Sequence, residues 1–483
     1  MIQLMKRIGD CRFEENRLAS ALRLFVCAGV AFGFAAGAAA AASDEKEQTF
    51  TLREVSVFDQ GADNFIRGQF GPCREKPFTE VKAYPRFKSA KPLYGSVSFG
   101  GIAEGADAKR TFYCAFDESE GTGKGYDRLY FDLNLDLDLR NDPVLKPQSR
   151  PPEAARLKYS NIKQQVLFDF LSLDFASGPA GTRAVQIMPR LYISKFGEEE
   201  YTQVNFVRTR LYKGDIKVGG KEYQALLGTD HAILGRLDQP NTALTLLPKA
   251  SQERVYWWGG DRLSAIQKIE GRFFTFSANP AGDQLTVHPY QGELGTFEVG
   301  PGERKVETLT MSGSLKGKDR AVPVGGEVVE GSPKAERRCQ LPVGDYTPSY
   351  ISVRIGRLEV DISENYHSDG KRQNRGDRPY VYGIAIRPDK PYVLDFSNPP
   401  AVLFASPEKG QRIKAGETLE VYGVLVDPKL DVMIRGLDDT SRKQTKDAEG
   451  KALGYERNLS LDPKVIITRA NGEKVVEGVM PFG

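Results

Sequence analysis

Apolar and polar residues alternate with a period of two along most of the chain beyond residue 44. The run 350–363 alternates in one phase, then shifts phase at Gly356, where a bulge or tight bend is expected. The run 212–227 consists of two half-apolar stretches joined by Gly219-Gly220, which is typical of a β-hairpin. This pattern predicts short, half-buried strands separated by turns.

Helical patterning is confined to residues 152–165, where a proline precedes good helix formers and one or two turns are expected. The sequence therefore predicts an all-β protein. We expect a larger antiparallel β domain over residues 44–311, followed by one or two β-sandwich modules of the Ig-like or carboxypeptidase-regulatory-like type.

The boundary between these parts is expected at residues 312–334, which are rich in Gly, Lys and Glu and poor in large apolar residues. A turn of the form L-P-x-G-x-Y follows at 341–346 and resembles the turn found in such small modules. A second boundary near Pro399-Pro400 gives modules at 335–398 and 399–483.

The first 42 residues have the layout of a secretory signal peptide. Five basic residues precede an uncharged stretch, Leu24–Ala42, that ends in small residues suited to cleavage. An uncleaved membrane anchor is the alternative, because this stretch is just long enough to span a bilayer. We expect export to the periplasm or the extracellular space, with no membrane span in the mature chain.

Charge argues against nucleic acid as a partner. The full chain carries a net charge of +3, and the leader accounts for +2 of it, which leaves +1 in the mature protein. This is no electrostatic footprint for nucleic acid or anionic lipid. The expected partner is a protein or a polysaccharide of the cell envelope.

Three of the five cysteines, Cys73, Cys114 and Cys339, lie beyond the leader. In an oxidising compartment the simplest expectation is one disulfide and one free thiol. Cys73 and Cys114 are the preferred pair because they are closest in sequence. Three buried, unpaired thiols are the alternative.

The stretch 129–142, LYFDLNLDLDLRND, has two incompatible interpretations. As a strand it alternates leucines with acids, which gives a solvated acidic edge. As a loop it spaces oxygen ligands in the way that calcium loops begin. The candidate metal ligands are Asp132, Asn134, Asp136, Asp138 and Asp142.

Comparison with an EF-hand loop separates these possibilities only in part. Position six should be Gly and is Leu137, and position twelve should be Glu and is Pro143, so a complete EF-hand is ruled out. A strand through about Leu135 is expected, followed by a turn that groups Asp136, Asp138 and Asp142. Both calcium binding and a solvated edge stay open.

Other candidate chemistry is sparse. A second acidic stretch, 228–240, places Asp230 and Asp238 at loop positions one and nine but lacks oxygen ligands between them. The three histidines are far apart in sequence, so a metal site or a serine triad would require the fold to position one of them. A carboxylate dyad of the glycosidase type has too many candidates among the acids to be picked out.

Several motifs occur together in a specific order: Y-P-x-F-x-S at 84–89, GYDRLY at 125–130 followed by D-x-N-x-D-x-D, and LPVGDY at 341–346. In this the chain resembles a group of secreted β-rich proteins of large-genome environmental bacteria. The resemblance implies export and β architecture and carries no assigned activity. Leu135 and Leu137 stand where related loops commonly have Gly, which weakens a calcium assignment.

The sequence therefore favours an exported, non-catalytic envelope or extracellular protein with a binding or structural role, in which calcium is the one expected cofactor. The alternative is an extracytoplasmic hydrolase that uses a carboxylate pair. The two predict different sites, because a hydrolase needs two carboxylates that converge in a cleft.

Overall fold

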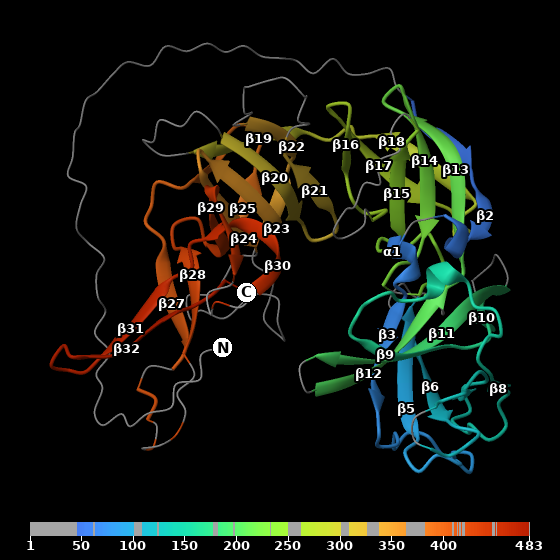
Figure 1. Cartoon of the computed structure of the whole chain (residues 1–483). Helices are drawn as coiled ribbons and strands as arrows, with labels where there is room; N and C mark the ends of the chain where they lie inside the picture. Colours follow the sequence, from blue (N-terminus) through green and yellow to red (C-terminus); the bar gives the residue numbers. More distant parts are fainter. Residues whose placement is uncertain are drawn as a thin grey trace, which may run out of the picture. The chain divides into compact units, whose positions relative to one another are not determined.

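The computed structural model is all-β and consists of several sheets, nearly all of them antiparallel (Figure 1). Helical structure among the described residues is limited to the short turns α1 (Asp63–Ile66), η1 (Val57–Asp59) and η2 (Glu153–Ala155). The structure describes residues 46–482 except 61–62, 101–108, 123–124, 177–181, 197–198, 232, 250–261, 301–308, 326–337, 364–381, 408–409, 413, 415–416, 418–420, 447–449 and 451. The predicted all-β class is confirmed, and the signal peptide expected at 1–42 lies outside the described residues.

The chain divides into two compact units, an N-terminal unit of residues 46–290 and a C-terminal unit of residues 291–483. The N-terminal unit contains four sheets. Two of them have the orders β1-β18-β17-β16 and β15-β14-β13-β2, and they share one apolar core that includes Tyr212, Phe274 and Leu285. Their strands are β1 (Gln48–Thr51), β2 (Arg53–Ser56), β13 (Arg210–Val218), β14 (Lys221–Gly228), β15 (Ala243–Pro248), β16 (Gln267–Ile269), β17 (Arg272–Ala278) and β18 (Gln284–Pro289).

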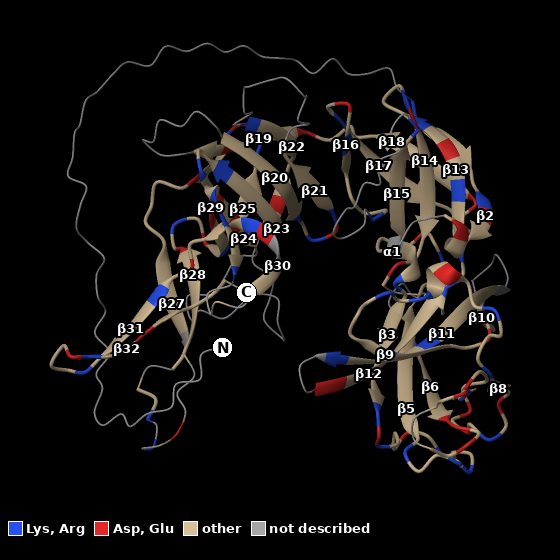
Figure 2. Ribbon diagram, in the orientation of Figure 1, with Lys and Arg blue, Asp and Glu red and all other residues tan. Residues whose placement is uncertain are grey.

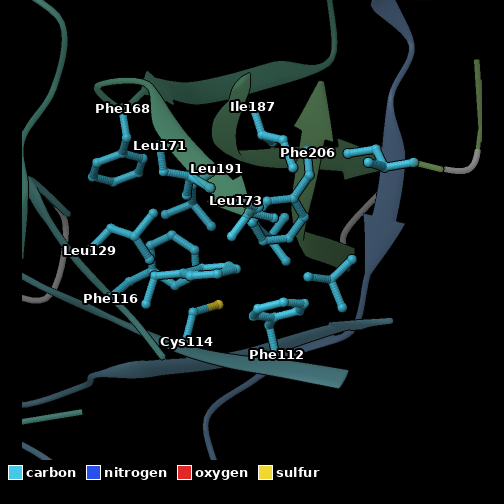
Figure 3. Packing of buried hydrophobic residues seen from close by; sticks show 14 of the residues in the cluster. Phe112, Cys114, Phe116, Leu129, Phe168, Leu171, Leu173, Ile187, Leu191 and Phe206 are labelled. Atoms are coloured by element: carbon cyan, nitrogen blue, oxygen red, sulfur yellow. The ribbon is translucent and has the colours of Figure 1, made fainter. Parts of the chain in front are cut away.

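The other two sheets carry the candidate site. Their orders are β10-β11-β12-β3, with β9 also on β11, and β4-β5-β6-β7-β8. Phenylalanines and leucines from both sheets form a second core, part of which Figure 3 shows. The strands are β3 (Gln69–Gly71), β4 (Cys73–Arg74), β5 (Leu93–Gly100), β6 (Lys109–Asp117), β7 (Arg128–Phe131), β8 (Val144–Leu145), β9 (Ile162–Leu167), β10 (Leu171–Ala176), β11 (Thr182–Phe196) and β12 (Glu199–Arg208).

The period of two explains why the five-stranded sheet β4–β8 is covered on both faces. Phe112, Cys114 and Phe116 of β6 point into the second core. Tyr113 and Ala115, on the opposite face, join a smaller cluster with aromatic residues from the segment between β4 and β5. That segment, residues 75–92, therefore packs over the outer face of the sheet.

The C-terminal unit is built around a nine-stranded sheet of order β21-β20-β23-β24-β29-β28-β27, with β25 on β23 and β30 on β29. A three-stranded sheet, β22-β19-β26, contains one parallel pair, and β31 pairs with β32. The strands are β19 (Leu294–Gly300), β20 (Leu309–Lys316), β21 (Ala321–Val324), β22 (Arg338–Pro342), β23 (Gly344–Ile355), β24 (Leu358–Ser363), β25 (Ile384–Ile386), β26 (Tyr392–Asp395), β27 (Ala401–Ser406), β28 (Tyr422–Asp427), β29 (Val432–Lys446), β30 (Ala452–Ser460), β31 (Lys464–Thr468) and β32 (Lys474–Val479).

This arrangement differs from the expected domain boundaries. The expected linker 312–334 contains β21 and most of β20, and β20 pairs with β23. The expected modules 335–398 and 399–483 share one sheet, because β24 of the first pairs with β29 of the second. Composition misled here, since Gly and Lys dominate the segment while its few apolar side chains, such as Leu315 and Val322, are buried.

The predicted turns lie where Gly is needed. Gly219 and Gly220 both have positive φ and join β13 to β14, as the hairpin prediction requires. Gly356, also with positive φ, lies in the turn between β23 and β24, so it ends one strand rather than bulging within it. Tyr346, in the L-P-x-G-x-Y turn, is buried and donates its hydroxyl to the carbonyl of Pro342 at 3.0 Å.

Candidate functional site

The acidic stretch forms a loop from its first aspartate onward. Strand β7 ends at Phe131, four residues before the expected end near Leu135, and no described residue between 132 and 142 belongs to a strand. Leu135 and Leu137 instead adopt left-handed backbone conformations, with φ of 59° and 67°. These are the positions where Gly would be unstrained, so surrounding contacts must hold the leucines there.

Side chains within the loop fold it into a series of tight turns. The backbone N–H of Asp136 donates to the side-chain oxygen of Asn134 at 3.1 Å, and the N–H of Asp138 donates to Asp136 at 2.8 Å. The N–H of Arg140 then donates to Asp138 at 3.1 Å. Each Asn or Asp thus caps the residue two positions on, which stabilises successive turns in place of a strand.

The first and last acids of the loop are buried. Asp132 is fully buried, and neither of its carboxylate oxygens accepts a hydrogen bond. Asp142 is 9% exposed; its Oδ1 accepts from the N–H of Leu133 at 3.0 Å, while its Oδ2 is buried without a partner. The loop therefore closes on itself around two buried carboxylates. The N–H groups of Leu135, Asp136 and Leu137 act on Asp132 without completing a hydrogen bond, and the N–H of Leu133 donates to Asp142.

Burial and the charges of nearby loop acids raise the pKa values of these two groups. Burial raises the pKa of Asp132, and the charge of Asp136 adds to the rise, against the opposing dipoles of loop N–H groups. Burial raises the pKa of Asp142 to about 6, with further contributions from the charges of Asp132, Asp136 and Asp138. The raised pKa values mean that binding of a proton or a cation to these oxygens is favoured.

The middle acids have partners inside the loop. Asp136 accepts from the side-chain amides of Asn134 at 3.0 Å and Asn141 at 2.7 Å, and these bonds lower its pKa. Asp138 forms a two-point ion pair with Arg140, with 2.6 Å between Nη2 and Oδ2, and its pKa falls to about 2. Asp138 is thus neutralised by Arg140, whereas Asp132 and Asp142 are not.

The five candidate ligands divide into two buried acids without cationic partners and three residues engaged in the loop's own hydrogen bonds. Across the described parts of the chain, no group of three or more His, Cys, Asp or Glu side chains is arranged to hold a metal ion. Calcium also binds backbone carbonyl oxygens and water, so two buried carboxylates can contribute to a shell that other oxygens complete.

The second acidic loop provides an internal comparison. Asp230 is buried but pairs with Arg262 at 3.1 Å. Asp238 forms a two-point pair with Arg236; burial acts to raise the pKa of Asp238, but the hydrogen bonds from Arg236 and Gln239 outweigh it and the pKa is lowered. In this loop arginine neutralises both acids. In the first loop, 132–142, the buried acids Asp132 and Asp142 have no arginine partner among the described residues, and this distinguishes the two loops chemically. Figure 2 marks acidic residues in red along the loops beside β6 and β8.

The predicted disulfide between Cys73 and Cys114 is wrong. Both thiols are free, and Gly95 of β5 lies between them in register, opposite Cys73 of β4 on one side and Cys114 of β6 on the other. Two strand spacings separate their Cα atoms by roughly 10 Å, which exceeds the limit of about 7 Å for a disulfide. Burial raises the pKa of Cys73 to about 12. Cys339, in the C-terminal unit, is buried.

The fold places His288 between two polar partners that sequence alone did not connect. Its Nε2 lies 2.8 Å from the hydroxyl of Ser277, and its Nδ1 lies 2.8 Å from a carboxylate oxygen of Glu47. A parallel contact of 3.0 Å joins Thr49 to Thr286 on the same sheet. These polar contacts connect β1 and Glu47, the residue before it, to β18 and β17. The sequence alone could not predict the contacts, because they depend on the pairing of strands that are distant in sequence.

Two further features bear on the hydrolase alternative. An open hollow of about 290 Å³ is lined by Asp127, Gln148, Arg156, Gln164 and Gln165 among others, and Asp127 is the sole carboxylate in its lining. In the C-terminal unit, Glu359 lies opposite Asp438 in register, and burial followed by the charges of Asp361 and Glu359 raises the pKa of Asp438. That pair lies in a different unit from the hollow.

Comparison with family models, curated proteins and solved structures finds no match to this chain. In the described residues no helix has the length and apolar character needed to cross a membrane. The candidate site must therefore be interpreted from its own geometry.

Proposed function

We propose that this chain is an exported, non-catalytic binding or structural protein of the cell envelope or extracellular space, and that a calcium ion stabilises its acidic loop. The single observation that carries the calcium proposal is Asp132, a fully buried carboxylate with no hydrogen-bond partner on either oxygen. An isolated buried carboxylate costs several kcal/mol, so it must be protonated or paired with a cation.

Asp142 strengthens this argument because it brings a second buried carboxylate to the first. The charge of Asp132 contributes to the raised pKa of Asp142, which supports their facing a common region. A divalent cation that prefers oxygen ligands would convert this repulsion into attraction. In the proposed site Asp132 and Asp142 contribute carboxylates, and backbone carbonyl oxygens and waters complete the shell.

The remaining candidates have a different role in this proposal. Asn134, Asp136 and Asp138 hold the loop in its turns through bonds to backbone N–H groups. Asp138 is in addition occupied by Arg140. The proposed ion has a structural function, because the two carboxylates that would bind it, Asp132 and Asp142, are both buried.

The non-catalytic assignment is supported by the lining of the hollow in the N-terminal unit, which holds a single carboxylate among the described residues, Asp127. A hydrolase of the alternative class would bring two carboxylates into one cleft. Export is supported by the leader sequence. Ig-like or carboxypeptidase-regulatory-like identity for the C-terminal strands is part of the proposal, supported by their antiparallel pairing and the Tyr346 turn. A protein or an envelope polysaccharide is the proposed partner.

Thermal melting of the mature protein with calcium and with a chelator tests the site. At a calcium concentration of about 100 Kd, binding adds roughly 2.7 kcal/mol, which corresponds to a rise of about 5–10 °C for a unit of this size. Asp132→Asn and Asp142→Asn should abolish the rise. Asp238→Asn, in the arginine-paired loop, is the matched control and should retain it. No shift at millimolar calcium would remove the metal from the proposal.

A further inference from the structure

The segment between β4 and β5, residues 75–92, crosses the outer face of the five-stranded sheet without joining it as a strand. Its only described bridge is a parallel one between Ala83 and Asp138 of the acidic loop. Its side chains Phe78, Tyr84 and Phe87 pack onto Tyr94 and Tyr130 of the sheet. We call residues 75–92 the cover segment.

The first half of the cover segment is attached to the acidic loop through backbone groups. The N–H groups of Lys82 and Ala83 both donate to the carbonyl of Leu137, at 2.8 Å and 3.3 Å. The N–H of Leu139 donates back to the carbonyl of Ala83 at 3.0 Å. The ammonium group of Lys82 donates to the carbonyl of Asp136 at 2.9 Å. On the loop side the four bonds involve Asp136, Leu137 and Leu139, which surround the left-handed turn at Leu137.

The second half is attached independently of that loop. The N–H groups of Lys88 and Ser89 donate to the carboxylate of Asp117, with distances of 3.1 Å and 2.8 Å to Oδ1. Asp117 is fully buried at the end of β6. The two halves of the cover segment are thus held by different parts of the chain. Backbone groups of the acidic loop hold the first half, and the carboxylate of Asp117 on β6 holds the second.

We infer that calcium binding to the acidic loop fastens residues 78–84 of the cover segment onto the sheet, while residues 87–90 stay attached in either state. This inference rests on the calcium site of the proposed function. Without the ion, repulsion between Asp132, Asp142 and Asp136 favours opening of the loop, and opening moves the Leu137 carbonyl away from Lys82 and Ala83. The ion therefore controls exposure of the aromatic cluster under the segment.

Release of residues 78–84 should be detectable by trypsin cleavage. Lys82 is exposed within this stretch and provides a trypsin cleavage point. In the structure the N–H of Phe78 donates to the hydroxyl of Tyr84 at 3.0 Å. Release of residues 78–84 would break this contact and make both side chains accessible to solvent. The inference thus predicts a local opening rather than unfolding of the sheet.

Hydrogen exchange of the full mature protein, measured by mass spectrometry with calcium and with chelator, tests the inference. Peptides covering 79–84 and 137–140 should exchange at least about tenfold faster in chelator, whereas the peptide covering 87–90 should change less than about twofold. Trypsin cleavage after Lys82 should accelerate in parallel. Asp142→Asn should exchange like the chelated protein at all calcium concentrations, and Asp238→Asn should behave like the wild type.

The outcomes separate the two proposals. A melting-temperature rise with calcium but equal exchange of 79–84 in both conditions would overturn the fastening and leave the calcium site standing. Equal acceleration of both halves would also overturn it, since the asymmetry between Leu137 and Asp117 is its basis. No calcium effect on melting or exchange would overturn both. Because the wild type is compared with itself, a variant that fails to fold does not obstruct the test.

Discussion

Buried charge is treated in two opposite ways within the N-terminal unit. Arg190 is only 1% exposed, yet its guanidinium donates to three backbone carbonyls and to Asn205. Burial lowers its pKa to about 10. Asp132 is equally buried and accepts nothing. The contrast at the scale of single residues shows that the fold does satisfy buried ions where donors or acceptors are available.

Arg190 should be a structural tie, because its partners lie on three separate elements. It joins β11 to Ala155 of η2 and to the carbonyls of Ile66 and Arg67 at the end of α1. Arg190→Met should lower the free energy of unfolding by about 3 kcal/mol, since several acceptors would lose their donors. Urea unfolding measures this. Recovery of stability in Arg190→Lys would show that charge, rather than the branched guanidinium, is what matters.

Asp142 makes the calcium-free protein sensitive to pH. Its folded pKa of about 6 lies above the ordinary value of 3.8, so the folded state binds this proton more tightly than the unfolded state. The contribution to stability is therefore lost as pH rises from about 4 to about 6. In chelator, melting temperature should rise by a few degrees between pH 7 and pH 5 through this group, and Asp142→Asn should flatten that part of the profile.

The same proton competes with calcium. Below pH 6 the affinity for calcium should fall by up to about tenfold per pH unit as Asp142 becomes protonated. Titration calorimetry at pH 7 and pH 5 checks this. Calcium affinity that is unchanged over that range would exclude Asp142 as a ligand and return the site to Asp132 alone.

At the scale of elements, the strands β4, β5 and β6 show why a thiol pair need not become a disulfide. Gly95 leaves space between Cys73 and Cys114, and a Cβ at Gly95 would lie 2.7 Å from the sulfur of Cys114. The absence of a side chain at Gly95 on β5 therefore leaves room for the thiol of Cys114 on the neighbouring strand β6.

Gly95→Ala should destabilise the unit by about 1–3 kcal/mol, because the core around Cys114 is closely packed. Gly95→Ala combined with Cys114→Ala should recover most of that loss, since the clash involves the sulfur. Urea unfolding of both single variants and the double variant measures the coupling. Strictly additive effects would show that the contact with Cys114 is not the cause.

Local pattern predicted elements well where the cause of the structure is itself local. The hairpin at Gly219-Gly220 follows from residues within the turn, and alternation over 350–363 follows from one buried face. The identity of the buried acids could not be predicted in this way. Asp132 is buried because β6 and the cover segment pack around the loop, and these lie far from it in sequence. The end of β7 was missed for the same reason, since contacts with residues 82–83 hold Leu137 in its left-handed conformation.

Domain boundaries required information on strand pairing that composition does not contain. The segment 312–334 has the composition of a linker, yet Leu315 is fully buried and faces Pro348 across the sheet. At the scale of the whole molecule the chain divides instead near residue 290, and each unit has its own buried residues. The candidate calcium loop and the cover segment both lie entirely within the N-terminal unit.

This division predicts how calcium should act on the whole protein. Calorimetry of the mature chain should show two unfolding transitions, because each unit buries its own apolar side chains. Calcium should raise the temperature of one transition by roughly 5–10 °C and leave the other within about 1 °C, since stabilisation reaches only the unit that binds the ion. The shifted transition should be identified as the N-terminal one by its sensitivity to Gly95→Ala. If both transitions move together, the units are coupled in unfolding, and the loop then stabilises more of the molecule than the residues it contacts.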